Sequence, residues 1–320
     1  MNAFLNKKNY LNFIKLLIFL FCFYIILKNI LKEDKAIEII SSIDIKYVLI
    51  IFILNFLLKL IESNFIFNII RISTNSDVKF YQWNKIFFDS QIFSMLLTSS
   101  GFFYRAIKLR IFSISFGDVI KIQTFLAWFY MFFCLILYTI EIIIFASDFY
   151  VLSYSPIPFL FSLISIIFFA PFFILFFFPK KIHFAGSLIQ WIYDKAWGIL
   201  SFSKDNLFNK KLLPSLINFG ITAHLIQFLM MFILIKSLNL NIDFGLIIIF
   251  FVINSFLDQI PITPKNIGVS EVILALVAIQ SGLIFSEGLM LKIVLRIINA
   301  CIIMLVAFFL NLKKIDRLIS

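Results

Sequence analysis

Apolar segments of about 20 residues recur along the whole chain, and this constrains the fold more than any other feature of the sequence. A transmembrane helix needs about 20 apolar residues, because a helix rises about 1.5 Å per residue and the hydrocarbon core is about 30 Å thick. Of the 320 residues, 62% are hydrophobic and 14% are charged, whereas a soluble domain is about half apolar and about a quarter charged. The sequence therefore predicts an integral membrane protein.

The expected fold is all-α, a polytopic bundle of transmembrane helices that forms a single membrane domain over residues 1–320. Its apolar segments predict about eight spans, at 12–31, 47–70, 122–144, 159–178, 214–235, 244–260, 270–286 and 291–310. A ninth segment, 86–104, is interrupted by Thr98-Ser99-Ser100-Gly101 and also contains Asp89 and Gln91. We interpret this ninth segment as a re-entrant or broken helix.

The distribution of lysine and arginine orients the spans, since cytoplasmic loops carry an excess of both residues. Loop 145–158 has neither and is expected outside, whereas residues 105–121, loop 179–213 and the C-terminal segment are basic and expected inside. Both termini are then cytoplasmic, in the plasma (inner) membrane. The net charge of +11 fits this bias and an attraction to anionic headgroups, and no nucleic-acid-binding module accompanies it.

Loop 179–213 is the longest hydrophilic stretch, and it contains Trp191, Tyr193 and Trp197 among its lysines. An amphipathic helix lying in the cytoplasmic interface would use such residues, with rings at headgroup depth and ammonium groups on lipid phosphates. A simple connector with interface anchors would use them as well. The sequence leaves both interpretations open.

The sequence contains no Ser/His/Asp set, no cluster of metal ligands and no phosphate-binding glycine-rich loop. Cys22, Cys134 and Cys301 each lie in an apolar segment without a C-x-x-C pair, so we expect small buried residues. His224 precedes Gln227 by three residues within a span, which favours a hydrogen bond to a neighbouring helix over catalysis. We therefore expect no enzyme, no cofactor and no metal, and an intramembrane enzyme is the least favoured alternative.

Ionisable side chains within predicted spans are functional candidates, because charge is costly at membrane depth. Lys59 and Glu62 lie three residues apart on one helix and can pair with each other. They form either a self-neutralising pair that faces the bundle or the polar lining of a path for lipid or ions. Arg296 lies deep enough in the last span to need a partner, and Glu271 is a candidate.

The densest polar segment runs from Asp258 to Glu271, between two predicted spans. Pro261 and Pro264 prevent a regular helix up to residue 264, and Gly268 permits positive φ or a close approach. Glu271 then opens a helix, where a carboxylate suits the positive end of the dipole. A cap and a turn would account for this pattern, but two prolines and a carboxylate between spans favour the lining of a substrate path.

The counterpart in the first half is a basic cluster that follows Gly101: Arg105, Lys108 and Arg110. Such a cluster beside a broken helix suits a lipid phosphate, which arginine binds through two parallel hydrogen bonds. For Lys108 and Arg110, an anchor at the cytoplasmic surface is an equal alternative. Interrupted segments in corresponding places of two halves are an indication of a transport site, and they are compatible with inverted halves.

These two segments resemble a known family, the flippase-like membrane domain that forms the transmembrane half of lysylphosphatidylglycerol synthase and occurs in related stand-alone proteins. The family pattern in the second half is roughly P-x-x-P-G-G-x-G-x-x-E, followed by a Gly and an Arg. The matching positions here are Pro261, Pro264, Gly268, Glu271, Gly282 and Arg296, with Lys265-Asn266 in place of the Gly pair. In the first half Gly101 and Arg105 match, whereas Phe102 stands at the family's Glu position.

The resemblance extends over nearly the whole chain in order and spacing. It implies a multi-pass protein that moves a phospholipid or a lipid-linked precursor between leaflets, with anionic or phosphate-bearing membrane lipids as its ligands. It implies no aminoacyl transferase activity, which in the synthase lies in a soluble domain after the membrane half. Glu271 and Arg296, with Arg105 opposite, are then expected to line the path. The alternative is a non-transporting partner that docks a glycosyltransferase or another lipid-modifying enzyme through loop 179–213.

Overall fold

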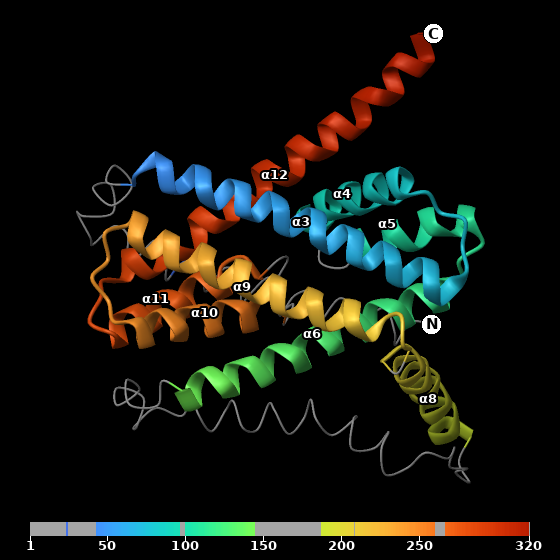
Figure 1. Ribbon diagram of the computed structural model, residues 1–320, viewed down its shortest axis with the longest axis horizontal. Helices are drawn as coiled ribbons and strands as arrows, with labels where there is room; N and C mark the ends of the chain where they lie inside the picture. The colour runs from blue at the N-terminus through green and yellow to red at the C-terminus, as the bar shows by residue number, and fades with distance from the viewer. Residues whose placement is uncertain are drawn as a thin grey trace. The chain divides into compact units, whose positions relative to one another are not determined.

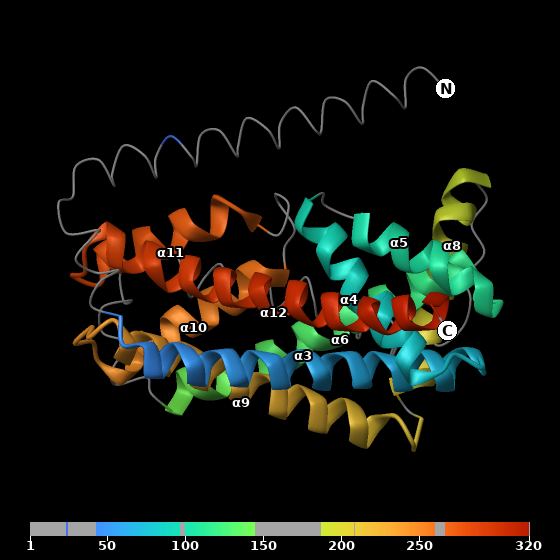
Figure 2. The ribbon, with the colours of Figure 1, turned by 90° about the horizontal axis from the view of Figure 1, so that it is seen from above.

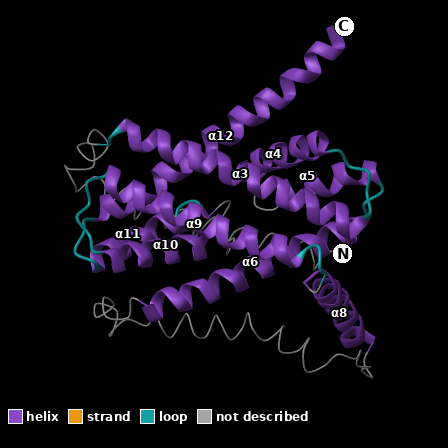
Figure 3. Cartoon of the chain, viewed as in Figure 1, coloured by secondary structure: helices purple, strands orange, loops and turns teal. Residues whose placement is uncertain are grey.

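The computed structural model describes residue 24 and residues 43–96, 100–144, 187–207, 209–259 and 266–319. All regular structure within these ranges is helical (Figure 3), which agrees with the expected all-α class. The predicted span 159–178, the span 12–31 except for Tyr24, and both Pro261 and Pro264 lie outside the described residues.

The helices are labelled in Figure 1. They are α3 (Ile45–Thr74), α4 (Phe80–Leu96), α5 (Ser100–Leu109), the 3-10 helix η1 (Arg110–Phe112), α6 (Phe116–Ile144), α8 (Ser187–Leu207), α9 (Leu213–Ser237), α10 (Phe244–Gln259), α11 (Val269–Gln280) and α12 (Phe285–Ile319). Among the described residues, two stretches are long and apolar enough to cross a membrane, Leu213–Ser237 and Phe285–Asn311. The prediction of eight spans therefore stays a prediction.

The boundary between the last two predicted spans differs from the expected one. α11 ends at Gln280 after 12 residues, a length of about 18 Å, so it is shorter than a span. Ser281 and Gly282 form a turn in which Gly282 has a φ of 80°, a conformation that favours glycine. α12 then begins at Phe285 rather than at residue 291.

Segment 86–104 contains two helices, since α4 ends at Leu96 and α5 begins at Ser100, with residues 97–99 outside the described ranges. α5 lies against α4 so closely that a Cβ on Gly101 would be 1.9 Å from Ser94 Oγ and 2.1 Å from the Ser90 carbonyl oxygen. The rings of Phe93 and Tyr104 stack at 4.7 Å across the same contact. Glycine is thus the residue that allows α5 to pack on α4.

The chain divides into two compact units that interleave along the sequence. Unit 1 comprises Met1–Lys59, Lys85–Tyr104 and Leu225–Ser320, and unit 2 comprises Leu60–Asn84 and Arg105–His224. The division passes through α3, α4, α9 and the start of α5, so the units are not successive halves of the chain.

Unit 2 is held together by rings and by buried polar side chains. The Phe65 ring of α3 stacks on the Phe219 ring of α9 with centroids 4.0 Å apart. Trp83 Nε1 donates to the Ser63 carbonyl at 2.8 Å, and Ser63 Oγ donates to Asn84 Oδ1 at 2.6 Å. Buried serine and asparagine contacts of this kind join helices in membrane proteins.

Unit 1 contains a close helix pair formed by α11 and α12. A Cβ on Gly288 would lie 2.5 Å from Ala278 Cβ and 2.7 Å from Ala275 Cα. Phe285 and Leu289 complete a buried cluster around Ala275. Small residues at the contact let the two backbones approach, and this approach places the polar side chains of α12 beside the start of α11.

Large apolar side chains face outward on the long helices. α9 exposes Ile217, Ile221, Leu225 and Leu229, one per turn, and α12 exposes Ile297, Met304, Leu305, Phe308 and Phe309. Polar residues are buried instead, among them Ser63, Asn84, His224, Glu271 and Lys292. Extended exposed apolar surfaces mark contacts with membranes or partners, so this distribution favours lipid as the solvent around these helices.

The predicted interfacial loop 179–213 contains a formed helix, α8, as the amphipathic-helix interpretation requires. Its last turn is attached to α3, because Ser73 Oγ donates to Asn206 Oδ1 at 2.8 Å. The Phe202 ring also lies edge-on to the Phe125 ring of α6 at 6.3 Å. The location of α8 in a membrane interface stays a prediction.

Candidate functional site

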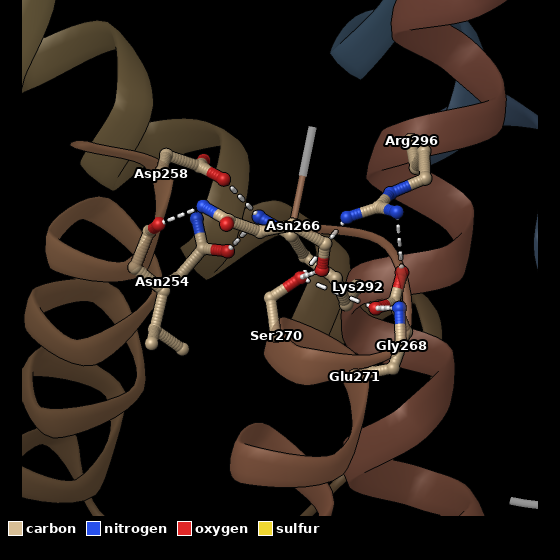
Figure 4. A network of polar contacts seen from close by, with 9 residues as sticks. Asn254, Asp258, Asn266, Gly268, Ser270, Glu271, Lys292 and Arg296 are labelled. Atoms are coloured by element: carbon tan, nitrogen blue, oxygen red, sulfur yellow. Dashed lines mark hydrogen bonds and ion pairs between the residues drawn. The ribbon is translucent and has the colours of Figure 1, made fainter. Parts of the chain in front are cut away.

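The polar side chains of the candidate site come from α10, α11 and α12 of unit 1 (Figure 4). Lys292 and Arg296 are four residues apart on α12, so they lie on one face of that helix. Asn254 and Asp258 are likewise four residues apart on α10. Lys292 Nζ donates to Asn254 Oδ1 at 2.7 Å and to Asp258 Oδ1 at 2.6 Å, which joins α12 to α10.

The expected partnership of Glu271 with Arg296 is confirmed. Arg296 Nη1 lies 2.9 Å from Glu271 Oε1, and Arg296 Nη2 donates to Ser270 Oγ at 3.0 Å. The Glu271 side chain is only 5% exposed, whereas that of Arg296 is 24% exposed. The guanidinium therefore neutralises a buried carboxylate while keeping some access to the surroundings.

Glu271 also caps the helix that it opens. Its Oε2 accepts from the Gly268 backbone N–H at 2.7 Å, and Gly268 has a φ of 87°, which favours glycine. A carboxylate three residues into a helix that reaches back to the N-cap N–H is half of a capping box. One side chain thus serves as both the cap and the ion-pair partner. The lining of a substrate path by this motif stays a prediction.

The turn before α11 is fastened to the end of α10. Ser270 Oγ donates to the Asn266 carbonyl at 2.9 Å, and the Asn266 side-chain amide donates to the Leu257 carbonyl. Asn266 adopts a φ of 57°, which asparagine tolerates better than most residues. Sequence reasoning missed the roles of Ser270 and Asn266, because small polar residues near a turn are common and their contacts are not local.

Four charged residues make up what we call the charge quartet: Asp258, Glu271, Lys292 and Arg296. The Asp258 carboxylate also attracts Arg296 electrostatically, so the two ion pairs form one group with no net charge. Lys292 and Glu271 are its buried members, with side chains 6% and 5% exposed. The Asp258 side chain is 48% exposed, so a carboxylate and a guanidinium are the accessible members.

The first-half candidates are divided between the two units. Arg105 belongs to unit 2, where the Glu62 carboxylate attracts it electrostatically, and Lys108 is exposed in the last turn of α5. Lys59 is half-buried on α3 in unit 1. The pairing of Lys59 with Glu62 and the position of Arg105 opposite Glu271 stay predictions.

Asp89, which the sequence indicated only as a polar residue in the interrupted segment 86–104, makes contacts that were not predicted. Its Oδ2 accepts from the Tyr104 hydroxyl at 3.0 Å and its Oδ1 accepts from Asn311 Nδ2 at 3.2 Å. The carboxylate therefore joins α4 to both α5 and α12 within unit 1. A carboxylate within an apolar segment indicates a buried polar partner. The partners of Asp89 are 15 and 222 residues away in the sequence, so they could not be identified from the local sequence.

The remaining chemical candidates are accounted for by packing. Cys134 is buried as expected, but Cys301 is exposed, because it lies on the outward apolar face of α12 with Met304 and Leu305. His224 is buried, and its ring lies 5.3 Å from that of Tyr138 on α6. Within the described part of the chain, no group of three His, Cys, Asp or Glu residues is placed to hold a metal ion.

Comparison with protein-family models, with curated proteins and with solved structures finds no match to this chain. The resemblance to the flippase-like domain thus rests on the residues quoted for it above.

Proposed function

We propose that the protein is a multi-pass membrane protein that moves a phospholipid or a lipid-linked precursor between leaflets. The observation that carries this proposal is the charge quartet, which lies among helices whose outer surfaces are apolar. Ionisable groups are rare within membrane helices and mark substrate or ion pathways when they occur.

The short helices around the quartet support the same function. α10 and α11 have 16 and 12 residues, and about 20 are needed to cross the hydrocarbon. Irregular backbone at membrane depth is tolerated where protein or a watery cavity satisfies its polar groups. In transporters, discontinuous helices of this kind form the substrate site.

The accessible members of the quartet match the chemistry of a lipid headgroup. Arg296 offers a guanidinium, which binds phosphate through parallel hydrogen bonds. Asp258 offers an acceptor for hydroxyl or amine groups. A headgroup that binds the accessible parts of Arg296 and Asp258 leaves their ion pairs with Glu271 and Lys292 in place, while the acyl chains remain in the surrounding lipid.

The test is headgroup translocation in liposomes that contain a fluorescent anionic phospholipid. With active protein, an outer-leaflet quencher should remove more than half of the fluorescence, and the rate should fall at least tenfold in Glu271→Gln. Glu287→Gln is the matched control, because Glu287 also accepts from a backbone N–H three residues earlier, that of Ile284 at 3.0 Å, but lies outside the quartet.

If the quencher removes only the outer-leaflet half of the fluorescence although the protein is folded, the proposal is contradicted. The docking alternative would then be tested by deleting residues 187–207, the whole of α8. A bound glycosyltransferase or other lipid-modifying enzyme should co-purify with the full chain and be lost with the deletion.

A further inference from the structure

Exposed cations from four separate segments lie at helix ends of unit 2. We call the following set the basic end: Arg71 in the last turn of α3, Arg110 on η1, Lys204 in the last turn of α8, and Lys210 and Lys211 before α9. Both ribbon views place these helix ends toward the same end of the unit (Figure 1, Figure 2). The Ser73–Asn206 hydrogen bond fixes the end of α3 to the end of α8.

The charge of this surface is strongly one-sided. Among the described side chains of unit 2, the exposed carboxylates are Asp77, Asp205 and Asp118, the last 38% exposed. Lys79 and Lys108 are exposed in addition to the five cations of the basic end. The cations are spread over several helix ends rather than gathered around one point. Such a surface suits an extended array of negative groups better than a single small anion.

Exposed apolar side chains accompany the cations. Ile111 is 75% exposed and Ile107 is 64% exposed, and these residues flank Arg110 on one side of α5 and η1. Phe80 and Tyr81 are exposed at the start of α4. At a bilayer surface, apolar side chains and aromatic rings enter the headgroup region while lysine and arginine reach the phosphates.

We propose that the basic end of unit 2 binds the surface of an anionic phospholipid leaflet, separately from the translocation of lipid through the charge quartet. Most of these cations come from residues 105–121 and loop 179–213. The excess of lysine and arginine in these two segments predicts that they lie in the cytoplasm. The cytoplasmic leaflet carries the anionic lipids. A nucleic acid is also an extended polyanion, but it offers no apolar region for Ile107 and Ile111.

The experiment is lipid retention by the full chain. Protein is purified in detergent containing equal amounts of phosphatidylglycerol and phosphatidylcholine, and the bound lipids are quantified after washing. We expect phosphatidylglycerol to be retained at least threefold over phosphatidylcholine, with the preference reduced in high salt because salt screens exposed charges. Replacing all five cations of the basic end by glutamine should remove the preference.

Two further variants make the result decisive. In the first variant, lysine is exchanged for arginine and arginine for lysine at the same five positions, and the preference for phosphatidylglycerol should be kept. In the second, the exposed Lys46 and Lys236 of unit 1 are replaced by glutamine, and the preference should again be unchanged. Equal retention of the two lipids by the unaltered protein, or an undiminished preference in the glutamine variant, would overturn the proposal. So would nuclease-sensitive nucleic acid bound at these cations in place of lipid.

The liposome assay separates this inference from the proposed function. The glutamine variant keeps the quartet, so it should still translocate lipid in vesicles of neutral phospholipid. A chain without translocation that nevertheless retains phosphatidylglycerol would contradict the transport proposal and leave the basic end supported.

Discussion

Glu271 Oε1 lies 2.9 Å from Arg296 Nη1, while the other oxygen of the same carboxylate caps α11 through the Gly268 N–H. The ion pair thus connects the first turn of α11 to Arg296 of α12, two turns beyond Gly288, where α12 packs closely on Ala275 and Ala278 of α11. The position of the Arg296 guanidinium therefore depends on Glu271, a residue that also shapes the turn before α11.

The first prediction concerns the stability of this link. Glu271→Gln removes the charge partner of Arg296, and loss of one member of a buried pair costs on the order of 3 kcal/mol. Glu287→Gln weakens only a helix cap, which is worth about 1 kcal/mol. Unfolding midpoints in detergent should therefore fall much further for Glu271→Gln, and equal decreases would show that Arg296 does not rely on Glu271.

The second prediction is an asymmetry between the partners of the other ion pair. Asp258→Asn leaves the buried ammonium of Lys292 without a counter-charge, whereas Lys292→Met leaves a carboxylate that is 48% exposed and can be hydrated. Asp258→Asn should therefore destabilise the protein more, by about 3 kcal/mol for an uncompensated buried charge. The comparison uses unfolding free energies, with the exposed Lys236→Met as a control for the loss of one lysine.

The double variant Asp258→Asn/Lys292→Met extends this test. If the pair acts as a unit, the double variant should be more stable than Asp258→Asn alone, because the unpaired ammonium is gone. Additive losses would mean that the two residues do not interact in the folded protein.

The third prediction addresses the Asp89 contact. Tyr104→Phe removes the hydroxyl that donates to Asp89 Oδ2, and a hydrogen bond to a charged group is worth about 1.5–3 kcal/mol. In an Asp89→Asn background the same change should cost less, since the acceptor is then neutral. A double-mutant cycle on unfolding midpoints measures this difference. A coupling energy near zero would show that Asp89 does not interact with Tyr104 in the folded protein.

Helix identity followed from the sequence more readily than helix ends. Leucine, isoleucine and phenylalanine runs predicted α9 and α10 nearly to their termini, because continuous apolar segments of that length have few other folds. α6 begins six residues before its predicted span, at Phe116. A break between the last two helices was predicted at residues 287–290, whereas the turn lies at Ser281–Gly282, because apolar residues continue on both sides of it. Composition does not register a short turn between two helices of similar hydropathy.

One of the two ion pairs of the site could be predicted from the sequence. Arg296 needs a counter-charge, and Glu271 is one of few carboxylates in the apolar half of the chain, so their partnership could be inferred. Lys292 and Asp258 are 34 residues apart. Asp258 lay near the end of the predicted span 244–260, and α10, which extends to Gln259, aligns it with Asn254. Their contact depends on how α10 packs against α12, which no local pattern encodes.

The last prediction tests whether Gly101 is what permits the α4–α5 contact. A methyl group at this position would meet the Ser90 carbonyl oxygen at 2.1 Å and Ser94 Oγ at 1.9 Å, and the serine side chain can rotate away but the carbonyl belongs to the backbone of α4. Gly101→Ala should therefore separate the two helices and lower the unfolding midpoint, although alanine favours a helix over glycine by about 1 kcal/mol. Gly198→Ala is the matched control, because it lies within α8 with no atom within 4 Å of the new methyl group, and it should leave the midpoint unchanged or raise it. An unchanged midpoint in Gly101→Ala would mean that α5 does not pack on α4 in this way. The stacking of Phe93 on Tyr104, which belongs to the same contact, would then be contradicted too.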